Sequence, residues 1–315
     1  MTNKIIDAHM HITQWYGQDG RTVFDSIARY EEANGIVAVD NMCCSNNGNL
    51  WSGYEMDQSI LGAIAKLENP TVFTHGCVYI PEDRRQISRY RFRDQLDELM
   101  ELGLDGVKIC DFKPDAYKLL GTAELMEEYE DYIACCERYG VHMCWHVADP
   151  RDNWDPEKVS DYARRVGWFY GDGEHPSYDD FINMTYRLLD AHPNLNVMLA
   201  HMFFKSFEPD EIEGLLQKYP HVTIDLAPGW GMMDGFRTHY DKWYRIFREY
   251  SDRFLYATDA TMSVGTRVDT LAQAVLRFLT TDDTFETPGN HVAHGIALEQ
   301  EHLDRVLYQN HEREV

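Results

Sequence analysis

The sequence predicts a single (β/α)8 barrel (a TIM barrel), in which helices surround eight parallel strands. Two observations support this fold. Apolar runs of strand length alternate eight times with longer amphipathic segments, and 315 residues is the usual length of one such barrel. A doubly wound open sheet is the alternative, but it normally carries a glycine-rich phosphate turn after its first strand. A pair of histidines occupies that turn here, so we expect one barrel domain spanning residues 1–315.

Apolar runs identify the strands, and patterns of helical period identify the helices between them. The strands are expected at 4–8, 36–39, 72–80, 107–109, 141–147, 196–200, 222–226 and 254–257. The helices are expected at 22–34, 54–67, 89–102, 123–139, 178–191, 209–218, 236–250 and 267–279, with a terminal helix at 298–311. Gly35, Gly103 and Gly140 directly follow three of these helices, where glycine suits the left-handed conformation that ends a helix.

The composition is that of an acidic protein with a large core. Fifty-three acidic residues against 29 basic ones give a formal net charge of −24, and 44% of the residues are hydrophobic. Such a surface repels nucleic acid and anionic membranes, so neither is an expected partner. The net charge says little about the substrate, because a bound cation can dominate the local field.

The cysteines and the N-terminal segment predict a cytoplasmic protein. The seven cysteines include the adjacent pairs Cys43-Cys44 and Cys135-Cys136, and neighbouring cysteines rarely form a disulfide with each other. Reduced, buried thiols are therefore expected. The N-terminus lacks the basic start and apolar run of a signal peptide, and no apolar stretch reaches membrane-spanning length.

Residues that bind metals stand at the ends of several expected strands. His9 and His11 alternate at the end of the first strand, so their side chains point to the same side. His146 ends the fifth strand, while His201 and Asp259 follow the sixth and eighth. The active site of a parallel barrel forms where these strand ends meet. Imidazole and carboxylate groups suit zinc and its first-row neighbours, so a metal site is predicted.

These motifs resemble the amidohydrolase superfamily, and in particular the amidohydrolase-related branch of hydrolases, lactonases and metal-dependent decarboxylases. The similar segments are 7–11, 105–109, 146, 200–201, 257–259 and 303–310, nearly from end to end. The resemblance implies one divalent ion, Zn²⁺ with Mn²⁺ as the alternative, held by His9, His11, His146 and Asp259. It also implies that His201 and Asp259 transfer protons, and it allows a homo-oligomer.

The resemblance implies a metal-dependent hydrolase, in which metal-activated water attacks a lactone, amide or ester bond of a small organic substrate. The alternative is a non-oxidative decarboxylase of an aromatic or unsaturated carboxylic acid, which would use the same ligands. A third reading is a barrel that binds metal or ligand without turnover. The pair His201 and Asp259 counts against that reading, because a binding protein has no use for proton carriers.

Lys108, in the short fourth strand, has two open roles. In some branches of the superfamily such a lysine is carboxylated and bridges two metal ions, a less expected arrangement here. Otherwise Lys108 contacts the substrate or packs its stem in the barrel mouth. On neighbouring strands, Asp225 is expected to be a carboxylate near the metal, and His75 is expected to be a core histidine.

Four further residues are weaker candidates for substrate contacts. Arg151 and Arg267 follow ligand-bearing strand ends and could hold a substrate carboxylate, although surface ion pairing explains them equally well. Trp154 and Trp230 lie in loops after the fifth and seventh strands. They could line a pocket or simply cover the barrel rim.

Overall fold

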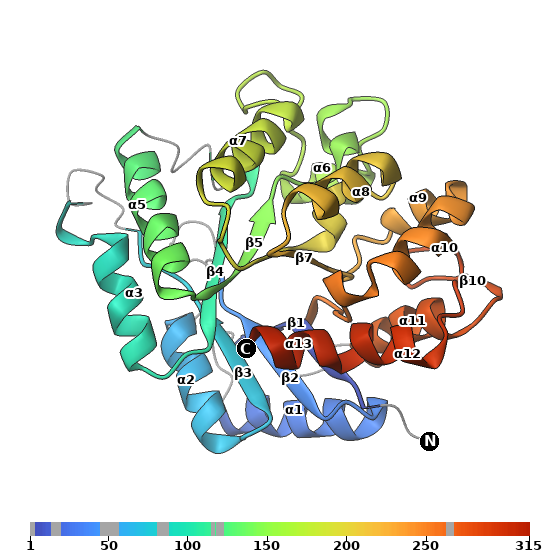
Figure 1. The fold of residues 1–315 in the computed structure, drawn as a ribbon, viewed down its shortest axis with the longest axis horizontal. Helices are drawn as coiled ribbons and strands as arrows, with labels where there is room; N and C mark the ends of the chain where they lie inside the picture. The colour runs from blue at the N-terminus through green and yellow to red at the C-terminus, as the bar shows by residue number, and fades with distance from the viewer. Residues whose placement is uncertain are drawn as a thin grey trace.

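Parallel strands form one curved sheet with helices on its outside, which confirms the predicted barrel (Figure 1). The computed structural model describes residues 4–13, 20–44, 57–80, 88–114, 117, 123–262 and 268–315. Within these residues the strand order is β8-β7-β6-β5-β4-β3-β2-β1-β9. The bounds are β1 Ile6–Ile12, β2 Ala38–Met42, β3 Val72–Gly76, β4 Gly106–Phe112, β5 His142–Val147, β6 Val197–Leu199, β7 Val222–Asp225, β8 Phe254–Leu255 and β9 Ala260–Met262. β10 (Thr284–Glu286) and β11 (Val292–His294) form a separate antiparallel hairpin that was not predicted.

One chain segment closes the barrel. β8 pairs with β7, whereas β9, only a few residues later, pairs with β1. Between these two strands the carbonyl of Tyr256 accepts a hydrogen bond from Ala8 N at 2.9 Å, and Asp259 N donates to His9 O at 2.8 Å. The eighth strand position is therefore interrupted at 256–259, and this interruption carries the predicted ligand Asp259.

Helices cover the outer face of the sheet, and most lie close to their predicted positions. The longer ones are α1 Gly20–Asn34, α2 Gln58–Glu68, α3 Phe92–Glu101, α5 Ala123–Tyr139, α7 Tyr178–Ala191, α8 Pro209–Lys218, α10 Tyr240–Glu249 and α11 Val268–Thr280. The short ones are η2 Arg151–Trp154, α6 Asp161–Val166, η3 His201–Phe204, α9 Met232–Thr238, η4 Ser251–Arg253, α12 Gln300–Asp304, η5 Arg305–Gln309 and α13 Asn310–Glu314. Gly35, Gly103 and Gly140 have φ angles of 67°, 76° and 68°, which confirms their predicted role at helix ends. In the described part of the chain, no helix is both long and apolar enough to cross a membrane.

Most predicted strands have different bounds in the structure: β1 is Ile6–Ile12 rather than 4–8, and β4 is Gly106–Phe112 rather than 107–109. β2 runs to Met42 rather than ending at 39, because the polar residues Asp40 and Asn41 are buried with polar partners. The side-chain oxygen of Asn41, for example, accepts a hydrogen bond from Ile12 N at 2.7 Å. β3 ends at Gly76, four residues before the predicted end at 80.

Two predicted helices are divided. The helix expected at 236–250 is split into α9 and α10 at His239, because α9 packs against β11 while α10 packs against α8. The terminal helix expected at 298–311 consists of α12, the wider π-helical turn η5 and α13. In α13 the Asn310 side chain donates to two backbone carbonyls, those of Ser251 and Phe254, which anchors this end of the chain.

Alternate residues of the strands face the two sides of the barrel wall. In β4, Val107 and Ile109 belong to the main hydrophobic core with the helices, while Lys108 between them faces the interior. A smaller buried cluster, separate from that core, includes Met42, Cys144 and others. All seven cysteines are free thiols.

Five side chains from β2, β3, β5 and α13 form what we call the C-terminal network. Asp40 lies 2.9 Å from His75 Nδ1 through one oxygen and 2.9 Å from His311 Nε2 through the other. His75 Nε2 lies 2.6 Å from His142 Nδ1, and His142 Nε2 lies 3.3 Å from Glu314. His75 is thus a core histidine with partners, as expected. The network ties the C-terminal helix to the barrel interior.

The C-terminal network determines which residue can occupy position 106 and which protonation states His75 and Asp40 adopt. A Cβ on Gly106 would lie 2.4 Å from His75 Nε2, so only glycine leaves room for the imidazole there. Burial lowers the pKa of His75, which therefore stays neutral. Burial alone would raise the pKa of Asp40, but its contacts with His75 and the hydrogen bond from His311 hold it well below its usual range. The unfolded chain would protonate histidine below about pH 6.5 and aspartate below about pH 4, so the network stabilises the fold at neutral pH and loses this effect as the pH falls.

We expect Asp40→Asn to lower the free energy of unfolding by about 3 kcal/mol at pH 7, because it leaves two buried histidines without their anionic partner. Chemical denaturation at several pH values measures this difference. It should shrink below about pH 4, where the wild-type carboxylate becomes protonated in the unfolded chain. Asp210→Asn, at an exposed ion pair with Lys242, is the control and should leave stability nearly unchanged. Equal effects of the two substitutions would contradict this role.

Candidate metal centre

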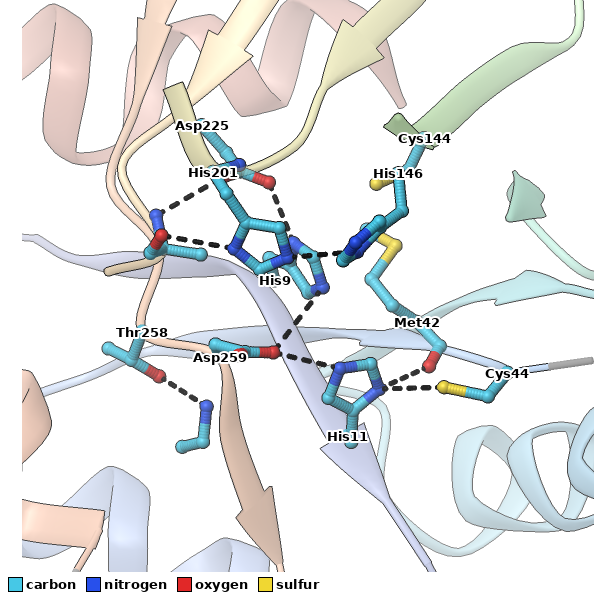
Figure 2. A network of polar contacts seen from close by, with 12 residues as sticks. His9, His11, Met42, Cys44, Cys144, His146, His201, Asp225, Thr258 and Asp259 are labelled. Atoms are coloured by element: carbon cyan, nitrogen blue, oxygen red, sulfur yellow. Dashed lines mark hydrogen bonds and ion pairs between the residues drawn. The ribbon is translucent and has the colours of Figure 1, made fainter. Parts of the chain in front are cut away.

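The predicted ligands and proton carriers meet at one end of the barrel (Figure 2). His9, His201 and Asp259 have ligand atoms that all lie within 4.8 Å of one another. His11 Nε2 lies 3.0 Å from Asp259 Oδ1, and His146 Nδ1 lies 3.2 Å from His201 Nε2. The structure thus links all five residues through direct contacts. His201 is as near to His9 as His11 is, with ring centroids 5.1 Å apart in both cases, so the geometry adds His201 to the available donors.

Protein acceptors hold the outer ring nitrogens of the two β1 histidines. His9 Nδ1 lies 2.7 Å from the Asp225 carboxylate, and His11 Nδ1 lies 2.6 Å from the carbonyl oxygen of Met42. These oxygens accept, so each Nδ1 carries the proton in the assigned tautomer. The lone pair of each neutral ring is then on Nε2, which faces the centre.

The other two histidines follow the same rule. His201 Nδ1 lies 3.1 Å from the carbonyl oxygen of Ala227, and His146 Nε2 lies 3.0 Å from that of Ala148. Carbonyl oxygens only accept, which leaves lone pairs on His201 Nε2 and His146 Nδ1. These two atoms face each other at 3.2 Å.

Inward lone pairs in contact repel each other unless a proton or a cation lies between them. His201 Nε2 faces His146 Nδ1, and His11 Nε2 faces an oxygen of Asp259. Neutral imidazoles and a carboxylate are a suitable donor set for a first-row divalent ion. A metal-binding histidine usually donates the N–H of its outer ring nitrogen to a protein acceptor, which orients the ring, and these four histidines do the same. The residues present therefore fit a metal ion.

Asp225, the last residue of β7, organises two of the histidines. One oxygen accepts from the backbone nitrogens of His201 at 2.7 Å and Ala227 at 3.1 Å, and the other faces His9. Burial raises the pKa of this fully enclosed carboxyl, although the nearby His201 and Lys108 oppose the shift. A carboxylate near the metal ligands was the expected role of Asp225.

Asp7 joins β1 to the segment that carries Asp259. Its carboxyl accepts hydrogen bonds from Thr258 N at 3.1 Å, from Thr258 Oγ1 at 2.6 Å and from the Tyr30 hydroxyl at 2.7 Å. Burial raises the pKa of Asp7 to about 7, although these hydrogen bonds lower it. Asp259 follows with a left-handed φ of 56°, which turns its side chain towards His11. The interruption of the eighth strand thus positions a predicted ligand.

His201 begins a left-handed turn. The φ angles of its four residues, His201 to Phe204, are 57°, 54°, 53° and 51°, and none is glycine. Left-handed backbone costs roughly 1–2 kcal/mol per residue outside glycine and persists only where other contacts enforce it. The hydrogen bond from His201 N to Asp225 and the stacked Phe204 ring, 5.3 Å from the imidazole, are two such contacts. No sequence pattern predicted this turn.

The electrostatics differ between the four inner groups. Burial lowers the pKa of His9 and of His201, so both are neutral. Burial would also lower the pKa of His11, but its hydrogen bond to Asp259 and that residue's charge raise it overall. Burial would raise the pKa of Asp259, and the hydrogen bond from His11 with the nearby His201 depresses it instead. A proton on His11 therefore satisfies Asp259, and a metal ion would replace that proton.

Lys108 lies among these groups. Its Nζ is 3.4 Å from His9 Nε2 and 3.2 Å from Cys144 Sγ. Burial would lower the pKa of Lys108, but the neighbouring Cys144, Cys110 and Asp225 raise it overall, so the amine stays charged. Cys144, with His9 and Asp225, also forms a second group of possible metal donors.

The candidate list from the sequence lacked Cys144. The sequence could have identified Cys144, because it stands two residues before His146 in the same strand and both side chains therefore lie on one face. The centre is most open on the side of Asp259, whose side chain is 39% exposed, while those of His9 and Asp225 are 1% and 0% exposed.

The weaker substrate candidates have other contacts. The Arg151 guanidinium pairs with Asp179 at 3.0 Å and lies 4.3 Å from the Tyr178 ring centroid. Trp154 donates its indole N–H to Pro176 O at 2.9 Å and packs in the loop after β5. The partly buried Trp230 lies against the backbone of Gly289. Their predicted substrate contacts remain predictions, and Arg267 lies outside the described residues.

Three solved structures have the same fold at low sequence identity. An uncharacterised TIM-barrel protein from Bordetella bronchiseptica aligns over 98% of this chain and 97% of its own, with a TM-score of 0.60 and 14% identity. The 2,6-dihydroxybenzoate decarboxylase from Rhizobium aligns over 99% and 98%, with a TM-score of 0.60 and 13% identity. An amidohydrolase from Burkholderia multivorans with bound zinc aligns over 98% of both chains, with a TM-score of 0.55 and 11% identity.

No protein-family model and no curated protein matches the sequence. The structural likeness confirms the barrel that the alternation of strands and helices predicts. One of the three structures is named an amidohydrolase and another a decarboxylase, the two classes that the strand-end motifs resemble.

Proposed function

We propose that this chain is a metal-dependent hydrolase of the amidohydrolase superfamily, acting on a lactone, amide or ester bond of a small organic molecule. The observation that carries this proposal is the convergence of four imidazoles and the Asp259 carboxylate on one centre. His9, His11, His146 and Asp259 would hold one divalent ion, for which zinc is the first choice. When bound, the ion would polarise the substrate carbonyl and lower the pKa of a neighbouring water molecule.

His201 and Asp259 would move the protons. The His201 ring donates through Nδ1 to Ala227 O, so its Nε2 can accept a proton without changing the tautomer. The low pKa of His201 keeps this nitrogen free at neutral pH. Asp259 is the most exposed member of the centre and could pass a proton to a leaving group. These two roles support turnover over simple binding.

Lys108 favours the second candidate function, decarboxylation of an aromatic or unsaturated carboxylic acid. A divalent ion would place a second cation beside the buried Lys108 ammonium. Two cations in one enclosed site attract an anionic ligand, and a substrate carboxylate would be such a ligand. The ammonium group of Lys108, 3.4 Å from His9 Nε2, is well placed to contact such a carboxylate.

The metal content is the first test of this function. Elemental analysis of protein purified without chelators should give about one equivalent of zinc or manganese per chain. His9→Asn should lose the ion, because it removes an enclosed ligand. Two equivalents, together with the mass of carbon dioxide added to Lys108, would show instead that this lysine bridges two ions. A wild-type protein that takes up no divalent ion would contradict the proposed function.

His201→Asn should separate catalysis from metal binding. We expect the variant to keep its metal and to lose turnover by about 100-fold or more, the range for a lost general base. Asp259→Asn should reduce both, since it weakens a metal bond and removes a proton carrier. Metal occupancy and turnover are to be measured on the same samples. If His201→Asn lost its metal as fully as His9→Asn, His201 would be a ligand, and unchanged turnover would exclude a proton-transfer role.

Lys108→Met should distinguish the two reactions. If Lys108 binds a substrate carboxylate, KM for carboxylic acid substrates should rise about 10- to 100-fold, the range for one hydrogen bond to a charged group. Hydrolysis of neutral lactones and esters should change much less. Panels of both substrate classes, assayed with wild type and variant at equal metal occupancy, make this comparison. An equal loss on both classes would contradict a carboxylate-binding role.

A further inference from the structure

A group of four side chains, which we call the lysine cluster, lies beside His146; Lys113, Asp149 and Tyr170 are buried and Trp168 is partly buried. Lys113 Nζ is 2.5 Å from Asp149 Oδ2 and 3.1 Å from the Tyr170 hydroxyl, and Tyr170 donates to the same Asp149 oxygen at 2.5 Å. The Lys113 ammonium also lies 4.1 Å from the Trp168 ring centroid. The side chains of Lys113 and Asp149 are only 7% and 6% exposed, so both charges are enclosed.

The second oxygen of Asp149 faces His146. Asp149 Oδ1 lies 3.4 Å from His146 Nε2, which also donates to the Ala148 carbonyl at 3.0 Å. Ala148 has a left-handed φ of 61°, a conformation that alanine seldom adopts, and this turn brings the carbonyl and the carboxylate to the same ring nitrogen. The other nitrogen, Nδ1, then faces His201 in the metal centre (Figure 2).

Stability alone is a poor explanation for the lysine cluster. A buried ion pair stabilises a fold little more than apolar side chains of equal volume would, because both charges lose their hydration. Such groups do fix geometry, since each atom must keep its partner. A carboxylate against the outer nitrogen of a metal-binding histidine is also the usual way to set its tautomer and orientation.

We propose that Asp149, Lys113 and Tyr170 are positioning residues that hold His146 with Nδ1 unprotonated and directed into the metal centre. This inference rests on the proposed function, in which His146 is a ligand. Lys113 follows β4, whereas Asp149, Trp168 and Tyr170 belong to the long segment 148–177 between β5 and α7. Because the buried Tyr170 contacts Lys113, which lies outside this segment, the segment must be docked against the end of β4 for the cluster to form. Docking of this segment thus completes the orientation of a ligand.

The chain contains a matched control. Lys205, also buried, lies 3.0 Å from Glu211, and the Tyr186 hydroxyl donates to the other oxygen of that carboxylate at 2.9 Å. The Lys205 ammonium lies 5.2 Å from the Tyr178 ring centroid. In this second lysine–carboxylate–tyrosine group, Lys205 follows η3, Glu211 lies on α8 and Tyr186 lies on α7. None of its described hydrogen bonds reaches a histidine of the candidate metal centre.

The test compares Asp149→Asn with Glu211→Gln, and Tyr170→Phe with Tyr186→Phe, by zinc affinity in competition with a chelator. Asp149→Asn should weaken zinc binding by about 10- to 100-fold, the usual effect of removing such a partner, and Tyr170→Phe should weaken it less. Both control variants should bind zinc as wild type does. Equal losses in the test and control pairs, or wild-type affinity in Asp149→Asn, would overturn the proposal. Tyr170→Phe removes one oxygen only, so it decides the question if Asp149→Asn does not fold.

A second measurement uses the metal-free protein. Nitrogen-15 NMR of labelled histidines, with His146 assigned by comparison with His146→Asn, reports which ring nitrogen carries the proton. We expect the Nε2–H tautomer in wild type and Glu211→Gln, and a mixture of tautomers in Asp149→Asn. An unchanged tautomer would overturn the proposal. If wild type binds no divalent ion, the proposed function fails, and this measurement still decides whether Asp149 positions the imidazole.

Discussion

The candidate metal centre depends on one constraint: in each of its four histidines, the N–H group of the outer ring nitrogen donates a hydrogen bond to a protein acceptor. Those acceptors are the Asp225 carboxylate and the backbone carbonyls of Met42, Ala148 and Ala227. Since a neutral imidazole has only one proton, the inner nitrogen of each ring presents a lone pair whenever that ring is neutral. The histidines lie on β1, on β5 and at the start of η3 after β6, and their inner nitrogens converge beside Asp259. A cation is the partner that such a set of donors can bind most favourably.

The backbone strain of the protein is concentrated where this constraint is met. Ala148 after β5, the turn His201–Phe204 after β6 and Asp259 between β8 and β9 all have left-handed φ angles. Each of these segments holds or follows a residue of the centre. Such conformations persist only when surrounding contacts enforce them, and the hydrogen bonds of Asp225 and Asp7 are among those contacts. Strain and ligand position are therefore two results of the same hydrogen bonds.

Strand β5 contributes side chains to three different groups inside the barrel. His142, Cys144 and His146 alternate along its inner face. His142 belongs to the C-terminal network, Cys144 contacts Lys108, and His146 reaches the metal centre. The C-terminal helix thus contacts the same strand that presents the proposed ligand His146. A parallel barrel allows this division, because its interior is filled by side chains in successive layers.

The sequence by itself determined the order of strands and helices, the glycines that end three helices and the residue types at the strand ends. These features depend on local periodicity, on the conformational freedom of glycine, and on His and Asp at the ends of apolar runs, all readable along the chain. Tertiary structure alone decided the break at His239, the turn at His201 and the partners of Asp40, because each depends on contacts between residues far apart in sequence. It also decided the tautomers: whether His9 turns Nδ1 or Nε2 inward depends on Asp225, 216 residues away. Sequence patterns identify which groups can bind a metal, but only the folded packing determines which atom each of them presents.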